Sequence, residues 1–139
     1  MLYCLEITVP ANTSKEDAVE KEVEIQEDVI VKVSIRFPPG PSGLLKVAVF
    51  YGEEQITPFH EHEWIAGDDE VVEDTLYFKC PEKPCPITIK AYNLDEAYDH
   101  TALVRILALN EEYALPHVAA SSALKAIKEF FRKIWGGPL

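Results

Sequence analysis

Apolar and polar residues alternate along most of the first 110 positions of this chain. The clearest case is the segment 29–37, which places Val29, Val31, Val33 and Ile35 on one face. A period of two residues is typical of a β-strand, because successive side chains of an extended chain point to opposite faces. Similar patterns predict seven further strands, over residues 2–9, 18–25, 45–51, 55–57, 71–78, 87–92 and 102–109.

Turn-forming residues separate these segments. Residues 38–43, Pro-Pro-Gly-Pro-Ser-Gly, force a loop, since proline removes backbone donors and glycine permits positive φ. About eight short strands at intervals of roughly 8 to 15 residues favour two packed antiparallel sheets. We therefore predict an all-β antiparallel β-sandwich, with a jelly roll as the first topology and an immunoglobulin-like sandwich as the alternative.

The last part of the chain has a different period. Ser121 or Ser122 can cap a helix, and Gly136-Gly137-Pro138 would end it. Apolar residues recur there at steps of three and four, beside a basic stripe, so we expect an amphipathic α-helix over 121–135. This helix either folds back on its own sandwich or docks on a neighbouring subunit or a membrane. Its expected interaction residues are Leu124, Lys125, Ile127, Lys128, Phe131, Arg132, Ile134 and Trp135.

These patterns divide the chain into three parts. We expect a sandwich domain over 1–110, a connector over 111–120 and the amphipathic helix over 121–135. A chain of 139 residues suits one domain with one core. Its 47% hydrophobic and 27% charged residues are typical of a globular protein, so it should fold unaided.

The charge is acidic and unevenly distributed. The net charge is -11, which makes a nucleic-acid surface over the body of the protein unexpected, because phosphate binding needs clustered lysine and arginine. Residues 121–139 carry four basic side chains and one acidic side chain, a local charge of +3 that leaves -14 on residues 1–120. Opposite charges on two parts of one chain favour a protein partner.

The start of the chain and its cysteines bear on location. Residues 1–10 are apolar but contain Glu6 and alternate like a strand, so they do not indicate a secretory signal. No run approaches the roughly 20 apolar residues of a transmembrane helix, and we expect a cytoplasmic or virion location. Cys4, Cys80 and Cys85 are too few for a secreted disulfide scaffold, although a local Cys80–Cys85 link is possible.

One stretch has the composition of a metal site. In a strand, His60 and His62 of the run His-Glu-His-Glu would share a face, and two imidazoles with a carboxylate suit zinc, iron or nickel. The stretch resembles the first half of a cupin motif. It departs from that motif because no glycine lies close upstream and because Glu70 is the only candidate for the glutamate that should follow. The second half of the motif is missing, so His100 would have to replace its histidine. A ligand- or metal-binding module therefore stays an alternative, and no cofactor is predicted.

Other candidate chemistry has a simpler explanation. The chain has no Gly-x-Ser-x-Gly elbow or ordered Cys/His pair, so no enzymatic activity is predicted. Asn93, Asp95 and Asp99 could offer oxygen ligands to calcium, but these residue types also prefer turns. A sugar-binding face is conceivable from four aromatic residues, which more often fill a core, namely Trp64, Tyr77, Phe78 and Tyr92.

Three runs carry a resemblance to a class of proteins. They are VIVKVSIRFPPGPSGL at 29–44, WIAGDDE at 64–70 and NLDEAYDHT at 93–101. They resemble small β-sandwich proteins encoded by prophages and viruses of bacteria and archaea, over approximately residues 5–109. The resemblance implies a virion-associated structural role, as a capsid decoration, vertex or spike-base subunit, with homo-oligomers or other structural subunits as partners. Membrane attachment through the C-terminal helix is a further, less favoured reading.

Overall fold

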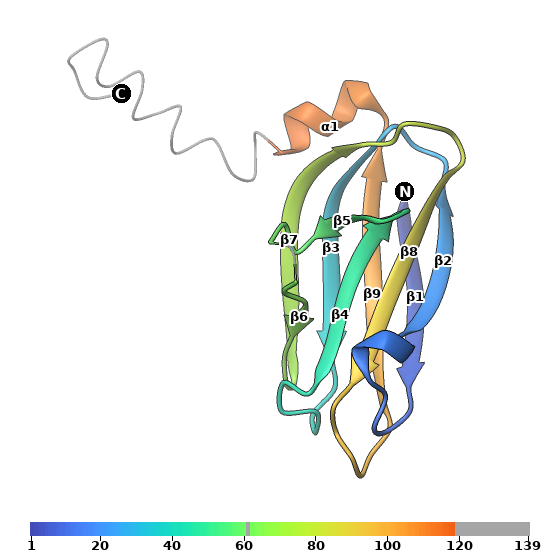
Figure 1. Ribbon diagram of the computed structural model, residues 1–139. Coiled ribbons are helices and arrows are strands. Elements are labelled where there is room, and N and C mark those ends of the chain that lie inside the picture. The colour runs from blue at the N-terminus through green and yellow to red at the C-terminus, as the bar shows by residue number, and fades with distance from the viewer. Residues whose placement is uncertain (61, 119–139) are drawn as a thin grey trace, which may run out of the picture.

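The computed structural model describes residues 1–60 and 62–118 and forms two antiparallel sheets packed face to face (Figure 1). Sheet A has the strand order β1-β9-β3-β7, with bounds Leu2–Val9, His100–Leu109, Val29–Phe37 and Glu70–Lys79. Sheet B has the order β2-β8-β4-β5, with bounds Val19–Ile25, Cys85–Asn93, Leu45–Tyr51 and Glu54–Thr57. The two-residue strand β6 (Ile65–Ala66) also pairs with β4. A short 3-10 helix, η1 (Lys15–Asp17), precedes β2.

The strand order identifies a jelly roll. Apart from β6, the first strand pairs with the last, β2 with β8, β3 with β7, and β4 with β5. Successive strands therefore alternate between the two sheets except at β4 and β5, which are neighbours in sheet B, as in an eight-stranded double Greek key. The predicted all-β sandwich and its first topology are confirmed, and the immunoglobulin-like order does not occur.

The core lies between the inner faces of the two sheets. Alternate residues of most strands meet there, and burial of their apolar surface is the main stabilising term. Fully buried members include Ile7, Val9, Ile25, Ile35, Phe37, Leu45, Val47, Ile87, Ile89, Val104 and Ile106.

Strand β3 departs from the predicted alternation. Its register shifts between Ile30 and Lys32 against both neighbouring strands, as a β-bulge does. Ile30 therefore joins the central core with Val33, whereas Val29 and Val31 form a separate cluster. The four residues expected on one face are thus divided between two.

A helix occupies most of the segment expected as a connector. Helix α1 (Glu111–Val118) begins after Asn110, whose carbonyl accepts hydrogen bonds from the N–H groups of Tyr113 and Ala114. The Asp28 carboxylate accepts the Glu111 N–H at 2.8 Å, which satisfies one free donor of the first turn. Ala114 is buried against the cluster of Val29 and Val31 on the outer face of sheet A.

The amphipathic helix expected over 121–135 lies outside the described residues, as do its interaction residues Leu124, Lys125, Ile127, Lys128, Phe131, Arg132, Ile134 and Trp135. Within the described part of the chain, no helix has the length and apolar character required to cross a bilayer.

Candidate functional site

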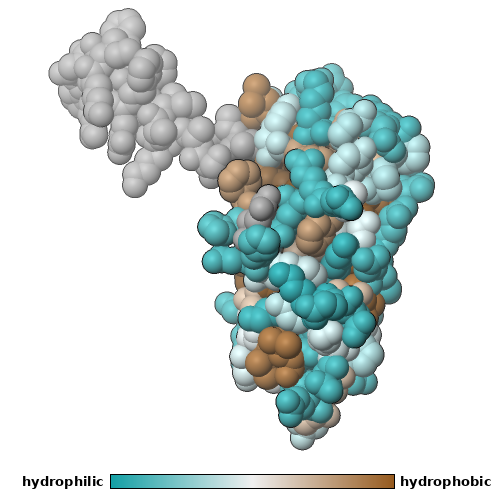
Figure 2. Space-filling view, viewed as in Figure 1, coloured by the Kyte–Doolittle hydropathy of each residue, from teal (hydrophilic) through white to brown (hydrophobic). Residues whose placement is uncertain are grey.

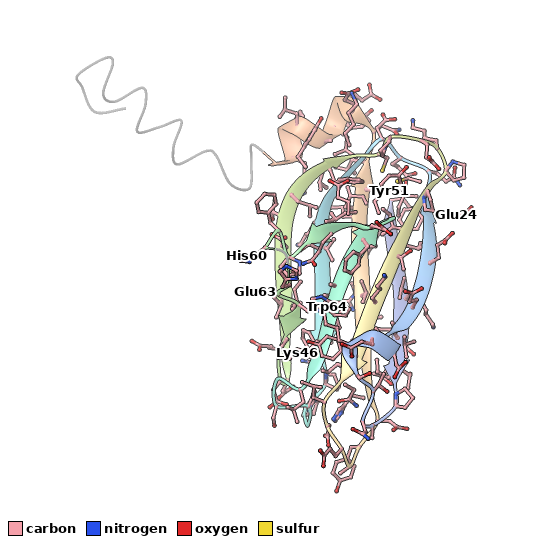
Figure 3. The ribbon with its side chains drawn as sticks, in the orientation of Figure 1. Glu24, Lys46, Tyr51, His60, Glu63 and Trp64 are labelled. Atoms are coloured by element: carbon pink, nitrogen blue, oxygen red, sulfur yellow. The ribbon has the colours of Figure 1, made fainter. Side chains whose placement is uncertain are left out.

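The candidate metal ligands His60, His62, Glu70 and His100 lie on separate segments. His60 (Figure 3) and His62 occupy the loop between β5 and β6. His62 has a φ of 72°, so the strand alternation that would align the two imidazoles does not apply. Glu70 begins β7, and its carboxylate accepts the Asp68 N–H at 3.3 Å. Across residues 1–60 and 62–118, no three His, Cys, Asp or Glu side chains gather as a metal site would require.

His100 has a structural environment at the start of β9. Its side chain is 8% exposed, and Nε2 lies 2.8 Å from Asp95 Oδ2. The Ala97 N–H, followed by the His100 side chain, lowers the pKa of the Asp95 carboxyl below its ordinary value. This pair fixes the loop between β8 and β9.

The residues considered for calcium serve the same loop. The buried Asn93 amide donates to the carbonyls of Val9 and Tyr98, at 3.3 and 2.9 Å. Asp99 Oδ1 accepts the Ala11 N–H at 2.7 Å. Their polar atoms therefore bond to backbone groups at the end of β1 and in the adjoining loops, which accounts for these residue types without a cation.

The structure instead gathers aromatic and charged side chains on the outer face of sheet B. The Trp64 ring packs edge-on against Tyr92, with centroids 4.9 Å apart, and against Phe50 at 5.8 Å. Lys15 Nζ lies 5.6 Å from the Trp64 ring centroid, and Lys90 Nζ lies 4.8 Å from that of Phe50. These distances suit cation–π interactions, which hold two lysines beside the aromatic cluster.

One side chain organises the loop that carries Trp64. Nε2 of Gln55 donates to the carbonyls of Pro58, Glu63 and His60, at 2.7, 2.9 and 3.2 Å. This loop presents Phe59, whose side chain is 92% exposed although the backbone beside it is anchored. Residue patterns did not single out Gln55, because its partners are carbonyl groups that a sequence does not place.

Between this loop and sheet B lies a groove of about 650 Å³. We call it the Trp64 groove. It is lined by Lys15, Phe50, Glu53, Glu54, Gln55, Phe59, His62 and Trp64. Trp64 and Tyr92 thus share the surface considered for sugar binding, whereas Tyr77 and Phe78 lie on β7 of sheet A.

A second surface lies on the side of sheet A. The α1 side chains of Tyr113 and Leu115 are 62% and 63% exposed. Helix α1 contacts β7, where Lys79 forms an ion pair with Glu111 at 3.2 Å and Tyr77 is 42% exposed. Figure 2 shows hydrophobic residues at the end of the molecule occupied by α1, on a face that is otherwise largely hydrophilic. We call Tyr77, Tyr113 and Leu115 the α1 apolar surface.

Edge strand β2 carries a row of acidic side chains. Glu20, Glu22 and Glu24 are exposed and follow one another at every second position, so they share one face of the strand. Glu20 pairs with Lys90 at 3.3 Å. Glu24 projects away from the sandwich in Figure 3. This face would suit a basic partner.

The cysteines are free thiols. Cys85 is buried, Cys80 is half-buried and Cys4 is exposed. Burial, followed by the hydrogen bond that its S–H donates to the Cys85 side chain, raises the pKa of Cys80 to about 12. The Cys80–Cys85 link considered from the sequence is therefore not formed here, although the two side chains are close enough to interact.

Comparison with solved structures shows where this fold recurs. It is similar to a chain of the cyanophage Pam1 capsid asymmetric unit, with a TM-score of 0.53 and 11% identity over 76% of this chain and 81% of that chain. A chain of the Bacillus endospore appendages, a family of disulfide-linked pili, matches with a TM-score of 0.41 and 13% identity over 79% of this chain and 87% of that chain. A chain in the structure of infectious bursal disease virus, Gx strain, matches with a TM-score of 0.32 and 8% identity over 78% of this chain and 32% of that chain.

These similarities concern the fold. At 11% identity, the phage capsid chain shares the sandwich architecture with this protein, as the sequence resemblance implied. No protein-family model matches the chain, and no curated protein sequence does either.

Proposed function

We propose that this chain is a non-enzymatic structural subunit that assembles with copies of itself, in a virion-associated position such as a capsid decoration, vertex or spike base. The observation that carries the proposal is the α1 apolar surface, where Tyr113 and Leu115 are 62% and 63% exposed. Its fold, similar to that of a chain in a phage capsid asymmetric unit, supports such a role.

The α1 apolar surface is suited to a protein partner. Of the α1 side chains that are described, Ala114 alone is buried, so the helix covers little of its own domain while exposing a tyrosine and a leucine. Tyrosine is enriched at the centres of protein interfaces, where it removes a large apolar area from water. A second copy of this chain is the occupant that we propose.

Charge complementarity supports association between copies. The segment 121–139 has a charge of +3, and the rest of the chain has -14. The acidic row of Glu20, Glu22 and Glu24 on β2 offers a neighbour's basic segment a matching face. Opposite potentials of this kind steer encounter and fix the relative position of two subunits.

The test measures the mass of the full chain by light scattering at about 0.1 mM, a concentration at which weak self-association is populated. We expect an oligomer whose mass falls to that of a monomer when residues 121–139 are deleted. Salt at about 0.5 M should also lower the mass, because it screens exposed charges. A full chain that is monomeric would refute the proposal, as would a deletion without effect.

A matched pair of variants tests the α1 apolar surface itself. The double variant Tyr113→Ser/Leu115→Ser should lower the oligomer mass. The control, Tyr98→Ser/Leu94→Ser, removes the same two residue types from the loop between β8 and β9, where they are 69% and 48% exposed. The control should keep the wild-type mass. Equal effects of the two double variants would contradict a specific role for α1.

A further inference from the structure

The Trp64 groove on the outer face of sheet B is lined by aromatic and charged side chains, and the proposed assembly role gives this lining no function. We propose that it binds an uncharged oligosaccharide. The proposal does not depend on the assembly role, since no residue that lines the groove belongs to α1 or to β2.

The groove offers rings for the apolar faces of sugar units. Phe59 is 92% exposed at its rim, while Phe50 and Trp64 are half-buried in its wall. A pyranose ring has at least one face on which several C–H groups are exposed, and such a face packs favourably against an aromatic ring. A volume of about 650 Å³ falls within the range of small-molecule sites.

The polar lining suits hydroxyl groups. Glu53 and Glu54 accept hydrogen bonds, Lys15 donates them, and His62 offers a donor and an acceptor when neutral. A sugar hydroxyl both donates and accepts, so it can use each of these partners. Because carboxylates and an ammonium group line the same groove, neither a polyanion nor a polycation finds a surface of uniform opposite charge.

The same lining disfavours a protein as the occupant. Glutamate and lysine are depleted at the centres of protein–protein interfaces, where desolvating an unpaired charge is costly. The Trp64 groove places two glutamates and a lysine among its rings. A hydrated ligand that brings its own hydroxyl groups meets these side chains at a smaller desolvation cost.

The groove is already formed in the free protein. The three hydrogen bonds that Gln55 donates to backbone carbonyls anchor the loop of Phe59, and the Trp64 ring packs against both Tyr92 and Phe50. A site ordered before binding avoids the entropy cost of ordering its loop when the ligand arrives.

The test uses the full chain carrying Trp135→Phe, so that Trp64 is the remaining tryptophan and reports on its own groove. The probes are linear tetrasaccharides of glucose, mannose, galactose and N-acetylglucosamine, titrated to about 5 mM, which detects affinities down to the millimolar range. We expect saturable quenching or a spectral shift with at least one probe. Absence of any response across the four probes overturns the proposal.

Substitutions locate the binding. Phe59→Ala should weaken binding about tenfold, as loss of an aromatic anchor does, without changing the melting temperature of an exposed loop. Tyr98→Ala is the control, because it removes another exposed aromatic side chain, from the loop between β8 and β9. Binding that Phe59→Ala leaves unchanged overturns the assignment. A fall in oligomer mass without any sugar response would show that the groove is a protein interface, which overturns it as well.

Discussion

Replacing Gln55 with glutamate tests how the loop of the Trp64 groove is held. The side-chain amide donates to three carbonyl groups, of Pro58, Glu63 and His60. A glutamate of the same shape has no hydrogen to donate when ionised, and its carboxylate would face carbonyl oxygens. The variant therefore removes the anchor while leaving the volume of the side chain unchanged.

The structure sets the size of the effect. Nε2 carries two hydrogens for three acceptors at 2.7, 2.9 and 3.2 Å, so two full hydrogen bonds are the most that can be lost. A hydrogen bond contributes about 0.5 to 1.5 kcal/mol net, which gives a loss of about 1 to 3 kcal/mol. Repulsion between the new carboxylate and the carbonyl oxygens should bring the loss of stability in Gln55→Glu toward the upper end of this range.

Two measurements separate local opening from global unfolding. Urea titration gives the free energy of unfolding, and hydrogen exchange reads the Glu63 N–H, which donates to the His60 carbonyl at 3.3 Å. Exchange there should accelerate by about 5- to 150-fold if the loop opens on its own, since 1.4 kcal/mol corresponds to a factor of ten.

The control is Gln26→Glu, at the only other glutamine of the chain. It makes the same change of charge at an exposed position, where the backbone N–H rather than the side chain donates to Tyr3. The control should leave both measurements near their wild-type values. A Gln55→Glu variant that matches it in stability and in Glu63 exchange would refute the anchoring role of Gln55.

Three further outcomes follow from single contacts. Thr57→Val removes the 2.6 Å hydrogen bond from a buried hydroxyl to the Asp74 carboxylate, which links β5 to β7. Urea titration should show that the free energy of unfolding falls by about 1.5 to 3 kcal/mol, and a fall of less than about 0.5 kcal/mol would contradict this expectation. Because burial raises the pKa of Cys80 to about 12, iodoacetamide near pH 8 should modify exposed Cys4 first by mass spectrometry, and equal rates would be a counter-result. The Ala97 N–H, and after it His100, lower the pKa of the Asp95 carboxyl, so its contribution to stability is present above pH 3.8 and disappears as the pH falls through the lowered value. Wild type and Asp95→Asn should therefore differ in urea stability at neutral pH and converge in strong acid, and a difference that persists in acid would contradict this linkage.

The fold was largely predictable because strands of this chain have one buried face. Alternation of period two survives in most of them, and turn residues mark their ends. The bulge in β3 was not predictable, because residues 29–31 are all valine or isoleucine. Hydrophobicity therefore does not reveal which of them faces the core. Helix α1 was missed because it is eight residues long, contains Pro116 and buries Ala114 rather than a repeated apolar stripe.

The candidate site was less predictable, since it is assembled from distant segments. Lys15, Phe50, Trp64 and Tyr92 come from η1, β4, the loop before β6, and β8, and only the sheet topology brings them together. The spacing of His60 and His62 suggested a metal site on a strand, but the two residues lie in the loop between β5 and β6. Aromatic composition grouped Trp64 and Tyr92 with Tyr77 and Phe78, which lie on the other sheet. The anchoring by Gln55 depends on backbone carbonyls, which a sequence does not place.

The two proposed surfaces should act independently, because they lie on opposite sheets and share no residue. Substitutions at sites that are well separated and have no common partner are additive. Tyr113→Ser/Leu115→Ser should therefore lower the oligomer mass and leave oligosaccharide titration of Trp64 unchanged, whereas Phe59→Ala should do the reverse. Combining the substitutions should give both effects at their separate sizes. If each variant altered both measurements, the groove and α1 would belong to one continuous interface between copies, and a single assembly site would have to replace the two proposed here.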